Sequence, residues 1–148
     1  MWMSKRRVLF LCTGNSCRSQ MAEGLVNHFL GEEWAARSAG TRPAGFVHPL
    51  AVDVMAELGI DLSDGRSKSV QEFSGVAFDV VVTVCDGAAE DCPLWLGSGR
   101  VLHIGFPDPA QATGNQVERL AVFRQVRDAI REQVLVYLEG VNEADQGS

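Results

Sequence analysis

Hydrophobic residues near the start of the chain form first a continuous run and then a helical repeat. Residues 8–11 are four consecutive apolar residues bounded by polar turn residues, a pattern typical of a short buried strand. Apolar residues then recur at every third or fourth position between Ser19 and Gly31, which predicts a first helix. Residues 34–38 predict a second short strand, and the segment around Pro43 predicts a loop.

The middle of the chain repeats this alternation. Helical spacing over residues 50–59 predicts a second helix that stops at Gly59. The polar residues 60–71 predict a loop with a short helical turn. Residues 78–84 are β-branched and almost continuously apolar, which favours a central buried strand. The polar residues 86–92 predict a loop after it, which residues 93–99 continue.

The last third of the chain predicts one more strand and a long helix. Residues 101–104 form the fourth strand, and apolar residues recur at helical spacing from Val117 to Leu138. The whole alternation predicts an α/β fold with a doubly wound, mostly parallel four-stranded sheet and helices on both faces. We expect a single domain over residues 1–148, with frayed ends at about residues 1–6 and 140–148.

Composition and charge narrow the class of protein. The chain has 148 residues, of which 46% are hydrophobic and 22% charged, the ordinary balance of a globular domain. Its net charge of −6 argues against a nucleic-acid binder. The apolar runs are too short for a membrane span or for the core of a signal peptide. We therefore expect a cytoplasmic protein that binds neither nucleic acid nor membrane, and we expect a monomer.

The segment Cys-Thr-Gly-Asn-Ser-Cys-Arg-Ser, residues 12–19, has the features of an oxyanion site. Cys12 ends the first strand and Arg18 begins the first helix, so the N–H groups of the turn and of the helix N-terminus converge. The Arg18 guanidinium can bind two oxygens of a tetrahedral anion, and the same field favours the thiolate form of Cys12. We predict an anion-binding loop around this nucleophile, made of Thr13, Gly14, Asn15, Ser16, Cys17, Arg18 and Ser19.

Two further strand ends carry reactive side chains. Cys85 closes the strand of residues 78–84, and Asp108 lies in the loop after the fourth strand. Ligands of open α/β sheets bind beyond the carboxyl ends of the strands, so we expect Cys12, Cys85 and Asp108 to share one site. The four cysteines, which include Cys17 and Cys92, form no Cys-x-x-Cys pair and lie at no zinc-finger spacing from a histidine. We therefore predict no metal site.

These motifs resemble a known family. Cys, five residues, Arg and Ser after an N-terminal strand resemble the loop of the low-molecular-weight tyrosine phosphatase fold. The longer run Cys-Thr-Gly-Asn-Ser-Cys-Arg-Ser-Gln-Met-Ala-Glu-Gly is similar to one branch, the thioredoxin-coupled arsenate reductases. Val-Thr-Val-Cys-Asp-Gly-Ala-Ala-Glu-Asp-Cys-Pro, residues 82–93, resembles the redox segment of that branch. The resemblance implies reduction of arsenate to arsenite, no bound cofactor, and thioredoxin as external reductant.

The resemblance also implies a role for each thiol. Cys12 would attack arsenate bound in the loop, and Asp108 would protonate the departing oxygen. Cys85 would then attack Cys12 and release arsenite. Cys92 would finally attack Cys85, moving the disulfide to Cys85–Cys92, where thioredoxin can reduce it. The resemblance gives Cys17 no role.

Several smaller roles follow from the same resemblance. Ser19 would hydrogen-bond the Cys12 thiolate, while Asn15 and Thr13 would brace the loop. In this chain Pro107 stands where the family often has a second acid, directly before Asp108.

Some family members bind potassium near the loop. Asn15, Glu23 and Ser38 match three of the residues that hold it, but Lys68 stands at the fourth position. Because an ammonium can replace the cation, we predict no potassium requirement.

The spacing of Cys85 and Cys92 predicts a conformational change. If the segment were helical, seven steps of ~1.5 Å would separate the two Cα atoms by about 10 Å, whereas a disulfide needs roughly 4.4–6.8 Å. The segment between Cys85 and Pro93 must therefore bend or unwind on oxidation, and Gly87 would ease the bend.

Two other functions stay open at this stage. A phosphatase of the same fold would need only Cys12, Arg18 and Asp108, although Ala110 and Gln111 provide no aromatic ring to stack on a phosphotyrosine. A non-enzymatic module could instead bind trivalent arsenic through three thiols. The reductant is open as well, because a glutathione or mycothiol system could replace thioredoxin.

Overall fold

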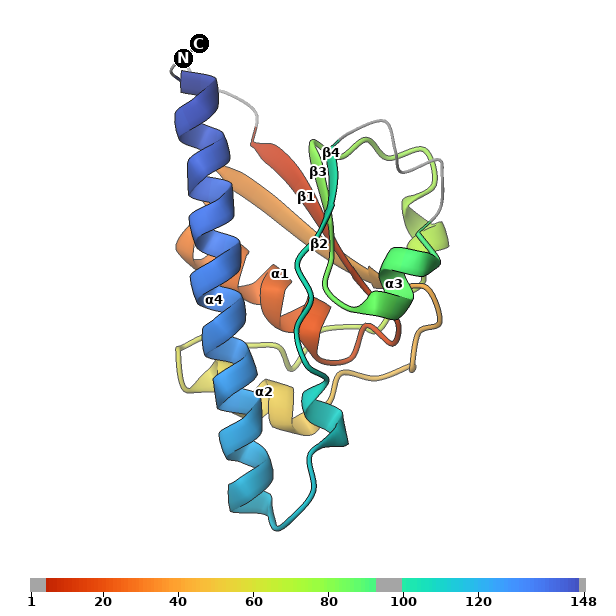
Figure 1. Cartoon of the computed structure of the whole chain (residues 1–148), viewed down its shortest axis with the longest axis vertical. Helices are drawn as coiled ribbons and strands as arrows, with labels where there is room; N and C mark the ends of the chain where they lie inside the picture. The colour runs from red at the N-terminus through yellow and green to blue at the C-terminus, as the bar shows by residue number, and fades with distance from the viewer. Residues whose placement is uncertain (1–4, 93–99, 147–148) are drawn as a thin grey trace.

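The sheet is parallel throughout. The computed structural model describes residues 5–92 and 100–146. Four strands in this part of the chain form one sheet in the order β2-β1-β3-β4, and every neighbouring pair is parallel (Figure 1). The strands are β1 (Arg6–Cys12), β2 (Trp34–Gly40), β3 (Val80–Thr83) and β4 (Arg100–His103). The predicted four-stranded α/β architecture is therefore confirmed.

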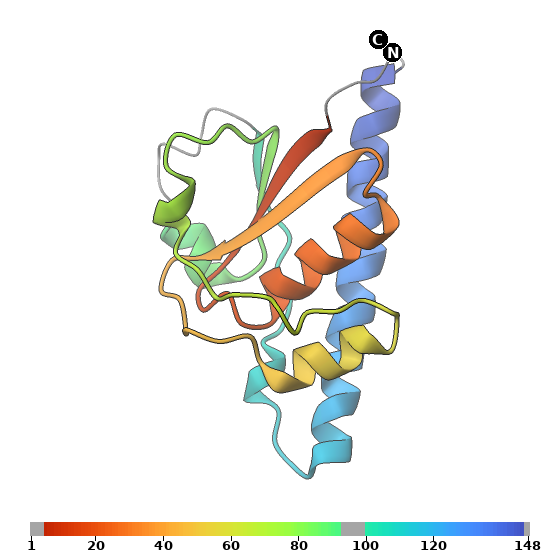
Figure 2. The same ribbon diagram turned by 180° about the vertical axis from the view of Figure 1, so that it is seen from behind.

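Helices lie on both sides of this sheet. The long helix α4 packs against α1 and α2, and these helices lie on one side of the sheet, while the short α3 lies on the other side (Figures 1 and 2). The helices are α1 (Arg18–Phe29), α2 (Pro49–Ala56), α3 (Asp86–Glu90) and α4 (Gln116–Gln146), with single 3-10 turns η1 (Val70–Phe73) and η3 (Pro109–Gln111). None of the helices in the described ranges combines the length and apolar character needed to cross a membrane.

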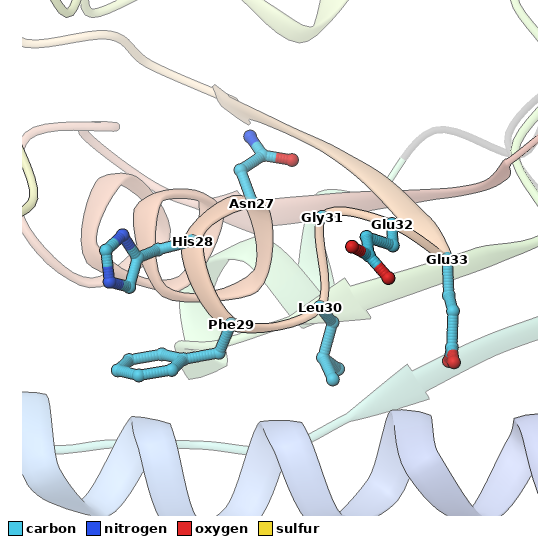
Figure 3. Close-up of a pocket in the computed structure, with 7 residues that line it drawn as sticks. All are labelled: Asn27, His28, Phe29, Leu30, Gly31, Glu32 and Glu33. Atoms are coloured by element: carbon cyan, nitrogen blue, oxygen red, sulfur yellow. The ribbon is translucent and has the colours of Figure 1, made fainter.

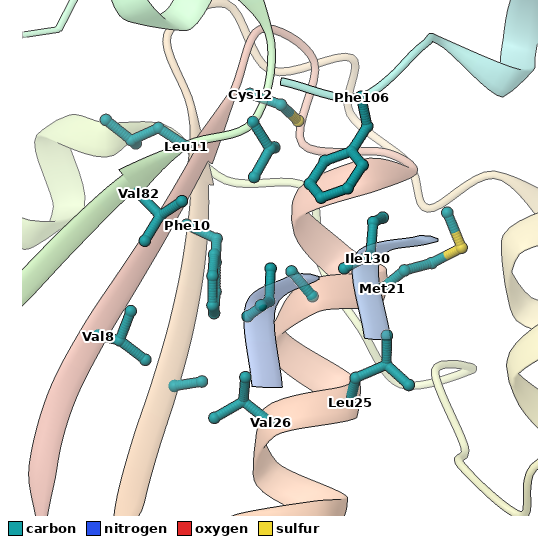
Figure 4. Close-up of a cluster of buried hydrophobic side chains, with 14 of the residues drawn as sticks. Val8, Phe10, Leu11, Cys12, Met21, Leu25, Val26, Val82, Phe106 and Ile130 are labelled. Atoms are coloured by element: carbon teal, nitrogen blue, oxygen red, sulfur yellow. The ribbon is translucent and has the colours of Figure 1, made fainter. Parts of the chain in front are cut away.

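The central strand β1 is buried on both faces. Val8 and Phe10 lie on the side of the sheet that faces α1 and α4, in the same buried cluster as Val26 and Ile130 (Figure 4). Leu9 and Leu11 point to the opposite face, because successive side chains of a strand alternate, and all six residues are completely buried. The continuous apolar run of residues 8–11 thus reflects a strand covered on both sides.

Three segments differ from the sequence prediction. Residues 86–90 form helix α3 instead of a loop, because five residues are too few to show a helical repeat. Strand β2 continues to Gly40, where a Cβ atom would lie 2.5 Å from the carbonyl oxygen of Thr13, so glycine permits the close approach. Helix α4 continues to Gln146 through the predicted frayed end, in a stretch where Glu, Ala and Gln favour a helix. The predicted loop of residues 93–99 lies outside the described residues.

Candidate functional site: an oxyanion loop beside two strand-end residues

The loop between β1 and α1 is held from its outer side. Backbone N–H groups of residues 41–48 donate hydrogen bonds of 2.8–3.2 Å to four loop carbonyl oxygens, those of Cys12, Thr13, Gly14 and Ser16. A carbonyl points away from the N–H group in the same peptide plane, so the N–H groups that follow these carbonyls face the centre of the loop. Asn15 takes a left-handed conformation, with φ of 50°. Such a ring of inward N–H groups suits a tetrahedral oxyanion.

Cys12 lies at the base of this ring. Its Sγ atom accepts a hydrogen bond from the N–H group of Asn15 at 3.1 Å and lies 2.8 Å from the Oγ atom of Ser19. Both side chains are buried with it. The predicted contact between Ser19 and Cys12 is therefore present.

The direction of the Ser19 hydrogen bond follows from its neighbours. The backbone N–H of Lys68 can only donate, and it donates to Oδ1 of Asn15 at 3.0 Å. The amide nitrogen Nδ2 of Asn15 therefore faces Ser19 and donates to its Oγ atom at 2.7 Å. Ser19 has one proton, which is left to point at the Cys12 sulfur. Ser19 is therefore a hydrogen-bond donor to this sulfur.

Arg18 and Asp108 face each other across the mouth of the loop. Arg18 donates to the carbonyl oxygen of Phe106 at 3.1 Å, and a second guanidinium nitrogen lies 3.8 Å from Oδ2 of Asp108. The other carboxylate oxygen of Asp108 accepts from the N–H of Ala110 at 3.0 Å. A cavity of about 480 Å³ opens here, lined by Arg18, Cys85, Asp86, Gly105, Phe106, Pro107 and Asp108.

Cys85 is buried at the end of β3, next to the oxyanion loop. Its Sγ atom lies 3.4 Å from Oγ1 of Thr13. Helix α3 begins at the next residue and also packs closely on the loop, because a Cβ atom at Gly87 would lie 2.8 Å from the same Thr13 oxygen. The structure therefore brings Cys85 to the pocket that holds Arg18 and Asp108.

Three polar residues beside Cys85 were not identified as site residues from the sequence: Thr83, Asp86 and His103. His103 lies 2.8 Å from Oγ1 of Thr83 through Nδ1, and 3.1 Å from the exposed carboxylate of Asp86 through Nε2. A Cβ atom at Gly105 would lie 2.9 Å from Nε2 of His103, so this glycine leaves room for the ring. The contacts join the start of α3 to strand β4.

Of the four cysteines only Cys85 is in the lining of this pocket, and Cys17 and Cys92 are placed differently from the two thiols described above. Cys92 is half-buried beyond the end of α3, and burial raises the pKa of its thiol. Cys17 is buried within the loop, and this burial raises its pKa to about 12, so Cys17 stays a neutral thiol. All four cysteines are reduced in this structure.

The Lys68 ammonium lies among oxygen atoms of Ser38, Glu23 and Arg66. Its Nζ atom lies 3.4 Å from Oγ of Ser38 and 3.8 Å from Oε1 of Glu23, and these two side chains share a hydrogen bond of 2.8 Å. Nζ also donates to the carbonyl oxygen of Arg66 at 3.3 Å. Burial lowers the pKa of Lys68, and the charge of Glu23 opposes that shift.

A second hollow lies at the far end of α1, away from the cysteines. It has a volume of about 410 Å³ and is lined by residues 27–33, with the carboxylates of Glu32 and Glu33 at its rim (Figure 3). The carboxylates in this lining do not suit an oxyanion. Among the described residues, no group of three or more His, Cys, Asp and Glu side chains is arranged to hold a metal ion.

Comparison with known proteins places this fold and loop in a family. The model of the low molecular weight phosphotyrosine protein phosphatases matches residues 7–146, and the chain belongs to this family. Within it the chain is similar to arsenate reductases. The arsenate reductase of Halalkalibacterium halodurans is 46% identical over 137 residues, covering 93% of this chain and 98% of the relative.

Solved structures agree with this placement. An arsenate reductase in the phosphate binding state superposes with a TM-score of 0.73 at 32% identity, covering 91% of this chain and 98% of that one. The thioredoxin-dependent arsenate reductase of Corynebacterium glutamicum gives a TM-score of 0.68 at 28% identity, covering 92% of this chain and 63% of that one.

Proposed function

We propose that the chain is an arsenate reductase that uses three thiols in sequence and is regenerated by thioredoxin. The observation that carries this proposal is the position of Cys85, whose sulfur lies 3.4 Å from Thr13 of the oxyanion loop. A phosphatase needs a nucleophile, an arginine and an acid, but no second thiol at the loop. Reduction of arsenate takes two electrons, which two thiols supply when they form a disulfide.

The first step is attack of the Cys12 thiolate on arsenic. Arsenate binds to the inward N–H groups of the loop and to the guanidinium of Arg18, which exchanges its contact with Phe106 for the anion. A sulfur–arsenic bond forms and an arsenic–oxygen bond breaks. Oδ2 of Asp108 lies 3.8 Å from a guanidinium nitrogen of Arg18. Asp108 is thus placed to give a proton to the departing oxygen, which leaves as water.

The second and third steps are thiolate attacks on sulfur. The Cys85 thiolate attacks Sγ of Cys12, the sulfur–arsenic bond breaks, and its electron pair stays on arsenic as arsenite leaves. Cys12 and Cys85 are then joined by a disulfide. Cys92 attacks Cys85, the thiolate of Cys12 is released, and the disulfide becomes Cys85–Cys92.

Thioredoxin is the proposed source of the two electrons that restore the enzyme. The similarity to the thioredoxin-dependent reductase of Corynebacterium glutamicum supports this choice. The segment that carries the final disulfide also supports it, because residues 89–91 are exposed and accessible to a protein partner. A monomer stays our expectation for the free enzyme.

The test is NADPH oxidation on addition of arsenate, with thioredoxin and thioredoxin reductase present. Wild type should turn over, and Cys92→Ser should lose turnover while still releasing one equivalent of arsenite. Ala89→Ser, at an exposed position of α3, is the control for a substitution in this segment.

Other outcomes would replace parts of the proposal. Turnover with glutathione and glutaredoxin, but not with thioredoxin, would overturn the partner and keep the chemistry. Hydrolysis of aryl phosphate that is unaffected by Cys85→Ser, without any arsenate-dependent turnover, would assign the chain to the phosphatases instead.

A further inference from the structure

Gln20 is a buried polar residue that the reaction steps above do not use. It lies in the first turn of α1, next to Ser19, with only 1% of its surface exposed. Its Nε2 atom lies within hydrogen-bond distance of three oxygens: the Asn15 carbonyl at 3.3 Å, Asn15 Oδ1 at 3.0 Å and the Arg66 carbonyl at 2.9 Å. Burial of an amide is costly unless its donors are paired, so these contacts fix the side chain firmly.

The contacts identify which end of the Gln20 amide faces the loop. All three neighbours are oxygen atoms, and two of them are backbone carbonyls that can only accept. The facing atom must therefore be the nitrogen, whose two hydrogens serve Arg66 and Asn15. Gln20 thus presents a donor to Asn15 Oδ1, beside the donor presented by the backbone of Lys68.

These two donors decide the orientation of the Asn15 amide. If this amide turned over, its NH₂ group would face two other donors, and its oxygen would face Ser19. Ser19 would then give its proton to Asn15 and could no longer donate to Cys12. Retaining Asn15 Oδ1 between Gln20 and Lys68 keeps Ser19 as a donor to the sulfur.

Gln20 also supports the strained residue of the loop. Asn15 has a φ of 50°, a conformation that most residues avoid. Its carbonyl is the one loop carbonyl from Cys12 to Ser16 that bonds to a side chain of α1 instead of a backbone N–H of residues 41–48. Through Arg66, the same Gln20 amide fastens the segment 66–68 against the loop.

We propose that Gln20 is a positioning residue for the catalytic thiolate, acting through Asn15 and Ser19. It fixes the direction of the hydrogen-bond chain Gln20–Asn15–Ser19–Cys12, so that Ser19 donates to the sulfur. This inference rests on the proposed function, in which Cys12 is the nucleophile.

The test is the pH profile of Cys12 alkylation by iodoacetamide, followed on the Cys12 peptide by mass spectrometry. Gln20→Met keeps the length of the side chain and removes the donor. The midpoint of the profile should rise by about one pH unit, a tenfold change in the thiolate equilibrium. The reason is that Ser19 is then no longer held as a donor to the Cys12 sulfur. The matched control Gln133→Met, at an exposed site on α4, should leave the midpoint unchanged.

A double variant separates positioning from support of the fold. Ser19→Ala alone should raise the midpoint at least as much as Gln20→Met. In Ser19→Ala, adding Gln20→Met should change the midpoint by less than a third of its effect in wild type, because its route to Cys12 is already cut. Equal effects with and without Ser19 would overturn the proposal.

A second substitution covers the case in which Gln20→Met does not fold. Gln20→Glu preserves shape and replaces the donor by an acceptor, so the midpoint should rise further than with the methionine. A wild-type midpoint in either folded variant would contradict the role of Gln20. Failure of the proposed function is a separate result, because it would appear as wild-type protein that does not reduce arsenate.

Discussion

The oxyanion loop and the redox segment differ in how firmly they are held. All five carbonyl oxygens from Cys12 to Ser16 have hydrogen-bond partners within the protein, and Asn15 and Ser19 are completely buried. The redox segment, residues 85–92, begins with Cys85 at the N-cap of α3. The Cys85 side chain makes no hydrogen bond to this helix, and α3 has only five residues. The contact between Asp86 and His103 is formed by an exposed carboxylate.

This difference matches two different tasks. The loop must hold donors at fixed positions around an oxyanion, and preorganised donors stabilise charge most effectively when nothing has to rearrange. The redox segment must bring Cys92 to Cys85, which a continuous helix over residues 85–92 would not allow. Segments with few buried contacts open at low cost in free energy. A fixed first thiol and a movable pair of later thiols are thus expected in one site.

The largest effect should separate the two regions by activity. Cys12→Ser should abolish both arsenate reduction and any aryl phosphate hydrolysis, by about 10³-fold or more, because it removes the nucleophile. Cys85→Ser should abolish reduction to the same extent and leave phosphate hydrolysis within about twofold. Both activities are measured on the same protein preparations, with Ala89→Ser, at an exposed position of α3, as control. Loss of phosphate hydrolysis in Cys85→Ser would show that the two regions are not separable in this way.

A smaller effect should follow when α3 is pushed away from the loop. Gly87→Val places a branched side chain where even a Cβ atom would lie 2.8 Å from Thr13 Oγ1. We expect roughly tenfold slower formation of the Cys12–Cys85 disulfide, because misplacement by about 1 Å can cost up to 10²-fold. Rapid quench and peptide mapping measure this rate. Ala89→Val, at an exposed position of the same helix, is the matched control, and an equal slowing there would contradict the explanation.

Lys68 provides a test of the outer support of the loop. Lys68→Met removes the ammonium from the oxygens of Ser38, Glu23 and Arg66. Potassium should then raise the melting temperature of the variant by about 2–4 °C, which corresponds to ~1 kcal/mol of binding energy in a domain of this size. Sodium at equal ionic strength should have less effect, and wild type should not respond. A response to potassium in wild type would contradict replacement of the cation by Lys68.

The smallest effect concerns His48, which supports the loop and caps α2. The backbone N–H of His48 donates to the carbonyl oxygen of Ser16. The ring atom Nδ1 accepts a hydrogen bond from the backbone N–H of Leu50 at 3.1 Å, which requires a neutral ring. Burial, assisted by the charge of Arg119, lowers the pKa of His48 below its ordinary value of 6.5, while Asp108 opposes the shift. The stabilisation that the neutral His48 ring provides is present above the pKa that His48 has in the unfolded chain. It is lost as the pH falls through the lower pKa that His48 has in the folded protein.

Denaturant unfolding between pH 7.5 and pH 5 checks this prediction. Wild type should lose up to about 1 kcal/mol over this range relative to His48→Asn, since asparagine is an equally good helix cap without a charge to gain. This loss in the free energy of unfolding is at most the contribution of a single helix cap, because solvent screens a partly exposed site. Parallel pH profiles of the two proteins would contradict the role assigned to His48.

Sequence alone could predict the loop because its residues are contiguous. The strand, turn and helix start all lie within residues 8–19, so spacing and residue type define the oxyanion site without knowledge of the fold. Cys85 and Asp108 could be added because a parallel sheet places its strand ends together. The structure brings both to the pocket lined by Arg18.

The missed residues depend on contacts that the sequence does not encode locally. Gln20 stands at the third position of α1, where glutamine commonly returns to the backbone of its own helix cap, and its real partners include Arg66, 46 positions away. Thr83 and His103 meet because β3 and β4 pair in that register. The sequence predicts a loop where α3 forms, because five residues with a glycine carry no helical repeat.

The most direct measurement of the central claim is disulfide mapping after a single turnover with one equivalent of arsenate. Reduced Cys92→Ser should accumulate a Cys12–Cys85 disulfide, and wild type should accumulate Cys85–Cys92, with one equivalent of arsenite released in each. This result would establish a fixed first thiol followed by a movable pair. Free thiols in wild type after exposure to arsenate, or the Cys12–Cys85 bond as its final product, would contradict the account.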